Sequence, residues 1–159
     1  MKPASKLLTL IGMIMVLGAF SAAGPAAAAT GSGDMDLIID GTQCQVTFDW
    51  NTGAGNPAPP AGSPATLSSF GTSGCSASIA EPPTTLTVSF AFGGAAWVSG
   101  VIQVRTFGID CRYNVPGMSG TYSGANPVET FVSGHLNKSF GSFLCPSPVL
   151  VGIGAYFHV

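Results

Sequence analysis

Four stretches of the sequence alternate apolar and polar side chains with a period of two residues: Gln43–Trp50, Leu86–Phe92, Val98–Phe107 and Leu150–Val159. This period places successive side chains on opposite faces of an extended chain, so each stretch predicts a half-buried β-strand. Gly93–Gly94 separates the second stretch from the third and predicts a hairpin turn. The alternation therefore restricts the chain to sheet structure.

Shorter strand candidates fill the intervals between these stretches. They are Asp36–Asp40, Ala65–Phe70, Tyr113–Val115, Gly120–Ser123 and Val128–Leu136. Strands that recur at about ten-residue spacing predict an all-β fold, either an antiparallel β-sandwich or a small β-barrel. Trp50 and Trp97 are expected to complete its core rather than to bind a ligand. Gly152 and Gly154 predict a last strand packed closely against another backbone.

The composition excludes several other classes of protein. The chain has 22 Gly and 12 Pro among 159 residues and only 8% charged residues, which is not the composition of a helical bundle or a coiled coil. Its ten Phe and its many Val, Ile and Thr residues exclude a disordered chain. Five basic residues and a formal charge of −2 provide no positive surface for a phosphate backbone, so no nucleic-acid partner is expected.

The first 29 residues have the order of a secretory signal peptide. Lys2 and Lys6 precede an uncharged apolar stretch of 14 residues, Leu7–Phe20, and a tract of small residues follows it. As a helix this stretch would rise about 21 Å, which is too short for a hydrocarbon core of about 30 Å. We expect cleavage after Ala29, or one or two residues earlier, and a single β-rich domain over 30–159. No later stretch is expected to cross a membrane as a helix, and the expected location is extracellular or on the cell-envelope surface.

All four cysteines lie in the part of the chain expected to be exported, and an even number in an oxidising compartment predicts two disulfide bonds. Ser69–Cys75 and Ser139–Cys145 share the pattern S-F-G-[S/T]-x-x-C, and an Ile-Asp pair lies shortly before Cys44 and Cys111. These matches suggest two related halves, each closed by its own bond. The expected pairs are Cys44 with Cys75 and Cys111 with Cys145. No C-x-x-C pattern or paired histidine accompanies them, so we expect no metal ligation.

The segment Asn51–Pro64 contains four prolines and three glycines. It cannot sustain a strand ladder, because each proline lacks an N–H donor and each glycine costs conformational entropy. We expect an exposed loop inside the first disulfide ring. With the neighbouring strand edge, this loop is the expected contact surface for a partner, an unknown protein or an envelope component. A proline-rich ligand for another domain is the alternative, but the regular P-x-x-P spacing is missing.

No pattern in the sequence predicts catalysis. His135 and His158 are the only histidines, and neither stands in a G-x-S-x-G, H-E-x-x-H or phosphate-binding motif. Two sets of carboxylates are the remaining candidates: Asp49, Glu81, Asp110 and Glu129 for glycoside hydrolysis, and Asp34, Asp36 and Asp40 for calcium. The first set is expected on turns and exposed strand faces, and the second lacks a calcium-binding loop with its Gly and terminal Glu. We therefore expect no catalytic, cofactor-binding or metal-binding residue, and no cofactor.

Several short motifs give the chain a resemblance to a group of exported proteins. They are the signal segment, Cys44–Phe48 at the start of an alternating strand, Ser68–Cys75, Gly108–Cys111 followed by Gly120–Ser123, and the late Cys145 before a terminal strand. In order and spacing these features resemble small secreted four-cysteine β-rich proteins of actinobacteria that have no assigned activity. The resemblance covers most of 30–159 and departs at the proline-rich loop. It implies a four-cysteine, β-rich exported domain and supplies no catalytic residue.

These observations favour an exported, non-enzymatic β domain that serves as an interaction or structural module. An envelope-embedded β-barrel channel is the first alternative, because low charge, many glycines and alternating strands also describe such proteins. The expected strands are shorter than the roughly nine to eleven residues of a membrane-barrel strand, which argues against it. An extracellular enzyme, or an enzyme inhibitor that would use the loop 51–64, is the second alternative.

Overall fold

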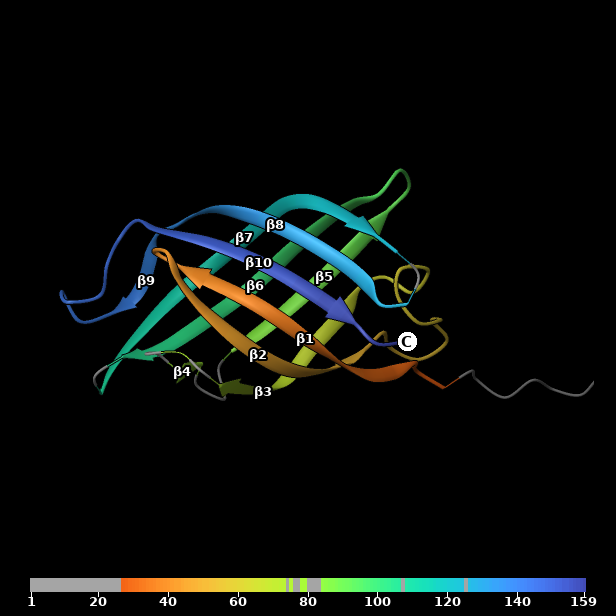
Figure 1. Cartoon of the computed structure of the whole chain (residues 1–159), viewed down its shortest axis with the longest axis horizontal. Helices are drawn as coiled ribbons and strands as arrows, with labels where there is room; N and C mark the ends of the chain where they lie inside the picture. Colours follow the sequence, from red (N-terminus) through yellow and green to blue (C-terminus); the bar gives the residue numbers. More distant parts are fainter. Residues whose placement is uncertain (1–26, 74, 76–77, 80–83, 107, 125) are drawn as a thin grey trace, which may run out of the picture.

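The computed structural model describes residues 27–73, 75, 78–79, 84–106, 108–124 and 126–159. Glu81 and the expected signal peptide, except for its last three residues, lie outside the described residues. The regular elements of the described chain are ten strands (Figure 1). They are β1 (Thr30–Ile39), β2 (Thr42–Asn51), β3 (Ala65–Ser73), β4 (Ser78–Ile79), β5 (Thr85–Ala91), β6 (Ala95–Thr106), β7 (Ile109–Ser123), β8 (Val128–Leu136), β9 (Lys138–Gly141) and β10 (Val149–Phe157).

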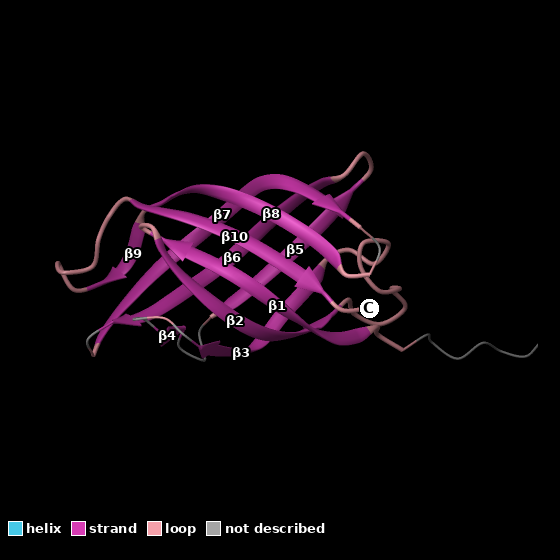
Figure 2. Cartoon of the chain, in the orientation of Figure 1, coloured by secondary structure: helices cyan, strands magenta, loops and turns pink. Residues whose placement is uncertain are grey.

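Eight of these strands close into an antiparallel barrel. The order around the barrel is β6, β5, β3, β2, β1, β10, β8 and β7, and the pairing of β7 with β6 completes the circle (Figure 2). The two short strands are additions to it, because β4 pairs with the end of β6 and β9 with the beginning of β7. The prediction of an all-β antiparallel fold is confirmed, and of the two predicted architectures the chain adopts the small barrel.

The barrel strands are longer than the sequence suggested. β7 runs for 15 residues and joins the two short segments expected at 113–115 and 120–123. Gly117, with a φ of +94°, is the extra residue of a bulge, because Val98 pairs with Met118 and Ser99 with Pro116. β1, β2 and β6 have 10, 10 and 12 residues. The expectation of short strands is therefore wrong, and strand length no longer argues against the channel alternative.

Side chains alternate between the barrel interior and the outer surface, as the two-residue period predicts. In the interior, toward the end of the barrel where β2, β5 and β10 finish, Phe157 meets Phe48, Trp50 and Phe90 edge to face, with ring centroids 5.4, 6.3 and 5.6 Å apart. Aliphatic side chains fill most other inward positions of the core. The core position predicted for Trp50 is confirmed.

Two expectations about single positions are wrong. Trp97 is 40% exposed, because Ala96 and Val98 on either side of it take the inward positions of β6. Gly152 and Gly154 face outward on β10, and a Cβ added at either would find its nearest neighbours 3.6–4.0 Å away. That is ordinary van der Waals contact, so no close approach of a second backbone requires glycine there.

The loop 51–64 folds over one end of the barrel, at the right of Figure 1. Pro59 is buried, and Ala58 packs against the core. Gly62 donates its backbone N–H to the carbonyl oxygen of Ala58 at 2.9 Å, and Thr52 donates to that of Ala29 at 3.0 Å. The loop that the sequence predicted as exposed is therefore exposed only in part.

The predicted disulfide between Cys111 and Cys145 is confirmed, and it joins the beginning of β7 to the loop after β9. The pairing of Cys44 with Cys75 stays a prediction. Cys44 is buried on β2, and Cys75 packs against the same core.

The repeated sequence pattern has no common structural setting. Phe70 of the first copy is buried on the barrel strand β3, whereas Phe140 of the second copy is exposed on the added strand β9. Ile39 ends β1 and Ile109 begins β7, so the two Ile-Asp pairs lie on opposite sides of their turns. The pattern therefore does not mark equivalent positions in two halves of the fold.

Candidate functional site

A hollow opens between the loop 51–64 and the turn that joins β5 to β6. We call it the end hollow. Its volume is about 420 Å³, within the range of roughly 300–1,000 Å³ that small-ligand sites occupy. It is lined by Pro60, Ala61, Ser63, Phe90, Ala91, Phe92, Gly93 and Tyr122. The loop and strand edge that the sequence pointed to as a contact surface thus form the two sides of one concave site.

Hydrogen bonds and ring contacts hold the two sides of the end hollow in place. Ser63 Oγ accepts the backbone N–H of Phe90 at 3.0 Å, which fastens the end of the loop to β5. Tyr122 donates its backbone N–H to the carbonyl oxygen of Gly94 at 2.7 Å, which fastens the β5–β6 turn to β7. The rings of Phe90 and Tyr122 meet edge to face at 5.3 Å, and Phe90 also contacts Phe157 of the core. The hollow is therefore preformed.

The lining of the end hollow selects an uncharged ligand. None of its side chains is charged at neutral pH. The Ser63 hydroxyl, which accepts from Phe90, retains its own proton for donation to a ligand. Phe92 is fully exposed at the rim. An apolar or ring-shaped group therefore matches the site.

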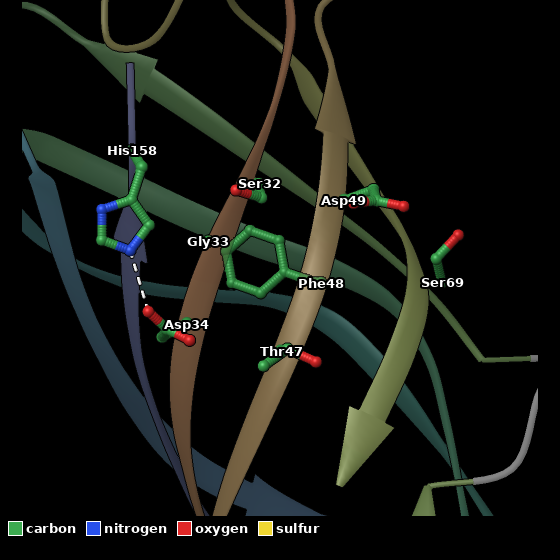
Figure 3. A pocket seen from close by; sticks show the side chains of 8 residues that line it. All are labelled: Ser32, Gly33, Asp34, Thr47, Phe48, Asp49, Ser69 and His158. Atoms are coloured by element: carbon green, nitrogen blue, oxygen red, sulfur yellow. Dashed lines mark hydrogen bonds and ion pairs between the residues drawn. The ribbon is translucent and has the colours of Figure 1, made fainter.

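A second hollow, of about 170 Å³, lies on the outer surface of β1 and β2 beside His158 (Figure 3). His158 Nε2 lies 2.8 Å from Asp34 Oδ2, and both side chains are more than half exposed. The contact exists because β10, which His158 follows, pairs with β1 in the barrel.

Among the described residues, Asp34 and His158 have no third member of a hydrolase triad beside them. In such a triad a hydroxyl is hydrogen-bonded to the second nitrogen of the imidazole. Ser32, Thr47 and Ser69 line the hollow, but in the described part of the chain none of their hydroxyls bonds to His158. Figure 3 shows Thr47 and Ser69 directed away from the imidazole ring. The geometry is that of an exposed hydrogen bond between a carboxylate and an imidazole, and no described hydroxyl is hydrogen-bonded to that imidazole.

The other candidate residues lie apart from one another. His135 is exposed on β8. Asp110 is bound by Arg105 through two contacts of 2.6 and 2.9 Å, and this hydrogen bonding lowers the pKa of Asp110 and raises that of Arg105. Asp49 lies on β2 and Glu129 on β8, two strands that are not neighbours. The structure therefore brings no two of the described glycosidase candidates together.

The three aspartates considered for calcium do not converge either. Asp36 accepts a hydrogen bond from Gln43 Nε2 at 3.2 Å, and Asp40 accepts the backbone N–H of Leu150 at 3.1 Å. Over the described residues, no group of three or more His, Cys, Asp or Glu side chains is placed to hold a metal ion.

The sequence did not predict the aromatic rim of the end hollow or the Asp34–His158 contact. Phe92 continues the alternation of Leu86–Phe92 and was expected on the buried face, but β5 ends at Ala91 and places Phe92 in the turn. The only sequence signal for this was the adjacent Gly93–Gly94 turn. The Asp34–His158 contact spans 124 positions, so no local pattern could predict it.

Among the residues described here, no helix combines the length and the apolar character needed to cross a membrane. No family model, curated protein or solved structure matches the chain.

Proposed function

We propose that this protein is an exported, non-enzymatic binding module that acts outside the cell or on the envelope surface, with the end hollow as its ligand site. The proposal rests on one observation, the end hollow. It is preformed, its side chains are uncharged and partly aromatic, and it lies at the end of a barrel whose interior is filled by side chains. Export is supported by the signal-peptide pattern of 1–29 and by the Cys111–Cys145 disulfide, since such bonds persist in oxidising compartments.

The orientation of side chains supports this proposal over a membrane channel. A channel barrel carries an apolar band on its outside and polar groups in its lumen. Here Phe48 and Trp50 of β2 fill the interior together with Phe157 of β10. Thr47 and Asp49 of β2 face outward. This distribution suits a barrel surrounded by water.

The end hollow should bind one uncharged aromatic probe per chain. N-phenyl-1-naphthylamine, whose fluorescence rises in apolar surroundings, is titrated into the protein purified with its disulfides intact. Ala61→Trp fills the hollow and Phe92→Ser removes its aromatic rim. We expect each variant to weaken binding at least about tenfold, equivalent to about 1.4 kcal/mol. Point substitutions are preferable to deletion of 54–62, because deletion would uncover the core beneath Ala58.

Phe131→Ser is the matched control, since Phe131 is exposed on β8 outside the end hollow. Equal loss of probe binding in this variant, or no saturable binding in the unaltered protein, would contradict the proposal. A hydrolytic activity that disappears in His158→Ala would contradict its non-enzymatic part.

Pull-down from the host's medium and envelope then identifies the natural ligand. It is the molecule that the unaltered protein captures and that Ala61→Trp does not.

A further inference from the structure

Three large apolar side chains project from the end of the barrel opposite to the end hollow. Phe140 on β9, and Phe143 and Leu144 in the loop that follows, are 71, 90 and 60% exposed. We call these three residues the apolar tip. In Figure 1, β9 and its following loop extend beyond the barrel at the left, so the tip is convex. Exposed apolar residues gathered in this way mark an interaction site.

The loop that carries the apolar tip is firmly held. The Cys111–Cys145 disulfide ties it to β7, and the hydroxyl of Tyr113 donates to the carbonyl oxygen of Pro146 at 3.0 Å. Within the loop, the backbone N–H of Cys145 donates to the carbonyl oxygen of Ser142 at 3.0 Å. These contacts fix the backbone that carries the apolar side chains, so ordering the loop on docking costs little conformational entropy.

Two cations flank the apolar tip. Lys138 Nζ donates to the carbonyl oxygen of Ser142 at 2.9 Å, directly beside Phe143, and Arg112 pairs in register with Phe140. Neither cation forms an ion pair with a described carboxylate. They are therefore available to an anionic partner.

Of the described carboxylates, two lie at this end of the barrel, Asp110 at the beginning of β7 and Asp40 in the turn between β1 and β2. Asp110 is held by Arg105, and Asp40 accepts the backbone N–H of Leu150. The other four are on the outer wall of β1, β2 and β8: Asp34, Asp36, Asp49 and Glu129. Lys138 and Arg112 therefore outnumber Asp40, which is the one described carboxylate at this end that no described cation pairs with.

We propose that the apolar tip docks on a lipid bilayer that contains anionic headgroups. Phe143 and Leu144 enter the boundary between headgroups and acyl chains, while Lys138 and Arg112 contact lipid phosphates. Exposed apolar anchors beside basic side chains are the combination that a membrane surface recognises. A convex, protruding tip suits a deformable bilayer, whereas a protein partner would need a matching pocket. The inference goes beyond the proposed function and does not depend on ligand binding in the end hollow, which would face away from the bilayer.

The test is co-sedimentation of the protein, purified with its disulfides intact, with phosphatidylcholine vesicles and with phosphatidylcholine vesicles containing phosphatidylglycerol. We expect preferential binding to the anionic vesicles. The double variant Phe143→Ser/Leu144→Ser should weaken this binding at least about tenfold. Arg112→Gln/Lys138→Gln should weaken it by a similar factor and remove its dependence on salt, because salt screens only the electrostatic part.

Phe131→Ser again serves as the control, because it removes an equally large exposed ring from the barrel wall. Circular dichroism and thermal unfolding confirm that each variant keeps the fold. Equal binding to both kinds of vesicle, or full binding by Phe143→Ser/Leu144→Ser, would overturn the proposal. The proposal would also be overturned if the protein did not bind vesicles and instead formed a dimer. Analytical ultracentrifugation would then show a dimer for the unaltered protein and a monomer for Phe143→Ser/Leu144→Ser.

Discussion

Glycines on β1 decide where aromatic rings can lie inside this barrel. Gly33 pairs in register with Phe48, and Gly31 pairs with Trp50. A Cβ at Gly33 would stand 2.4 Å from Phe48 Cζ, and one at Gly31 would stand 2.5 Å from Trp50 Cζ2. The rings therefore lie over the glycines of the neighbouring strand. In an eight-stranded barrel, whose interior is just wide enough for side chains, this arrangement makes room for Phe157 between them.

Gly33→Ala should lower the free energy of unfolding by about 1–3 kcal/mol. The added methyl group would meet both the Phe48 ring and the carbonyl oxygen of Tyr156, at 2.5 Å, and the backbone oxygen cannot move aside as a side chain can. Gly154→Ala is the control, because its Cβ would find nothing closer than 3.9 Å. Urea unfolding of both variants measures the difference, and similar losses in the two would contradict the explanation.

At the scale of single elements, β7 links the barrel to the loop that follows β9. Tyr113 on β7 is only 3% exposed, and its hydroxyl donates to the carbonyl oxygen of Pro146. Burial, reinforced by the negative charge of Asp40, raises the pKa of Tyr113 above its ordinary value of about 10. The folded protein therefore holds this proton more tightly than the unfolded chain does.

Stability should consequently depend on pH in the alkaline range. The contribution of Tyr113 is complete below about pH 10 and is lost as the pH rises from there through the raised pKa of the folded state, because the unfolded chain ionises first. Tyr113→Phe should remove this part of the dependence of the unfolding free energy on pH. It should also cost about 0.5–1.5 kcal/mol at neutral pH through the lost hydrogen bond. Urea unfolding at a series of pH values measures both effects.

The control for this prediction is Tyr156→Phe, since Tyr156 lies half-buried on the outer side of β10 and its hydroxyl bonds to no described residue. This variant should keep the alkaline slope. If Tyr113→Phe keeps the full slope as well, some other group causes it.

The sequence predicted those elements whose signal is local. The alternation around Phe48 marked β2, and Gly93–Gly94 marked the turn between β5 and β6, because each needs only neighbouring residues. The course of the chain past Pro116 was not predictable, because the bulge at Gly117 depends on the partner strand. The outward orientation of Trp97 was not predictable for a related reason. Small residues such as Ala96 can take the inward positions of a strand where the barrel interior has little room.

The candidate site was less predictable than the elements. Pro60, Phe90 and Tyr122 come from three separate segments, and only closure of the barrel brings them together. The sequence indicated the loop 51–64 as a surface feature, but nothing local indicated that Ala58 would pack against the core and leave a hollow beside it.

For the molecule as a whole, the two ends of the barrel are stabilised by different contacts. The loop 51–64 packs over one end, while the Cys111–Cys145 disulfide lies at the other (Figure 1). Cys44 and Cys75 belong to this second end. The β2–β3 ladder stops there at the pair Gln45–Ser73, one residue from Cys44 and two from Cys75. A bond between these cysteines would therefore fasten β2 to the chain leaving β3 at the point where main-chain pairing ends.

Peptide mapping under non-reducing conditions should find Cys44 joined to Cys75 and Cys111 joined to Cys145. On the chain-entropy model, closed loops of about 32 and 35 residues each stabilise the fold by roughly 3.7 kcal/mol, a large share of the 5–15 kcal/mol typical of a domain. Reduction of both bonds should therefore unfold the barrel, whereas Cys111→Ser/Cys145→Ser should lower its stability by about half as much as full reduction does. The ladder geometry leaves Cys44 beside the end of β3, which favours Cys75 as its partner. A peptide that links Cys44 to Cys111 or Cys145 would rule out this pairing.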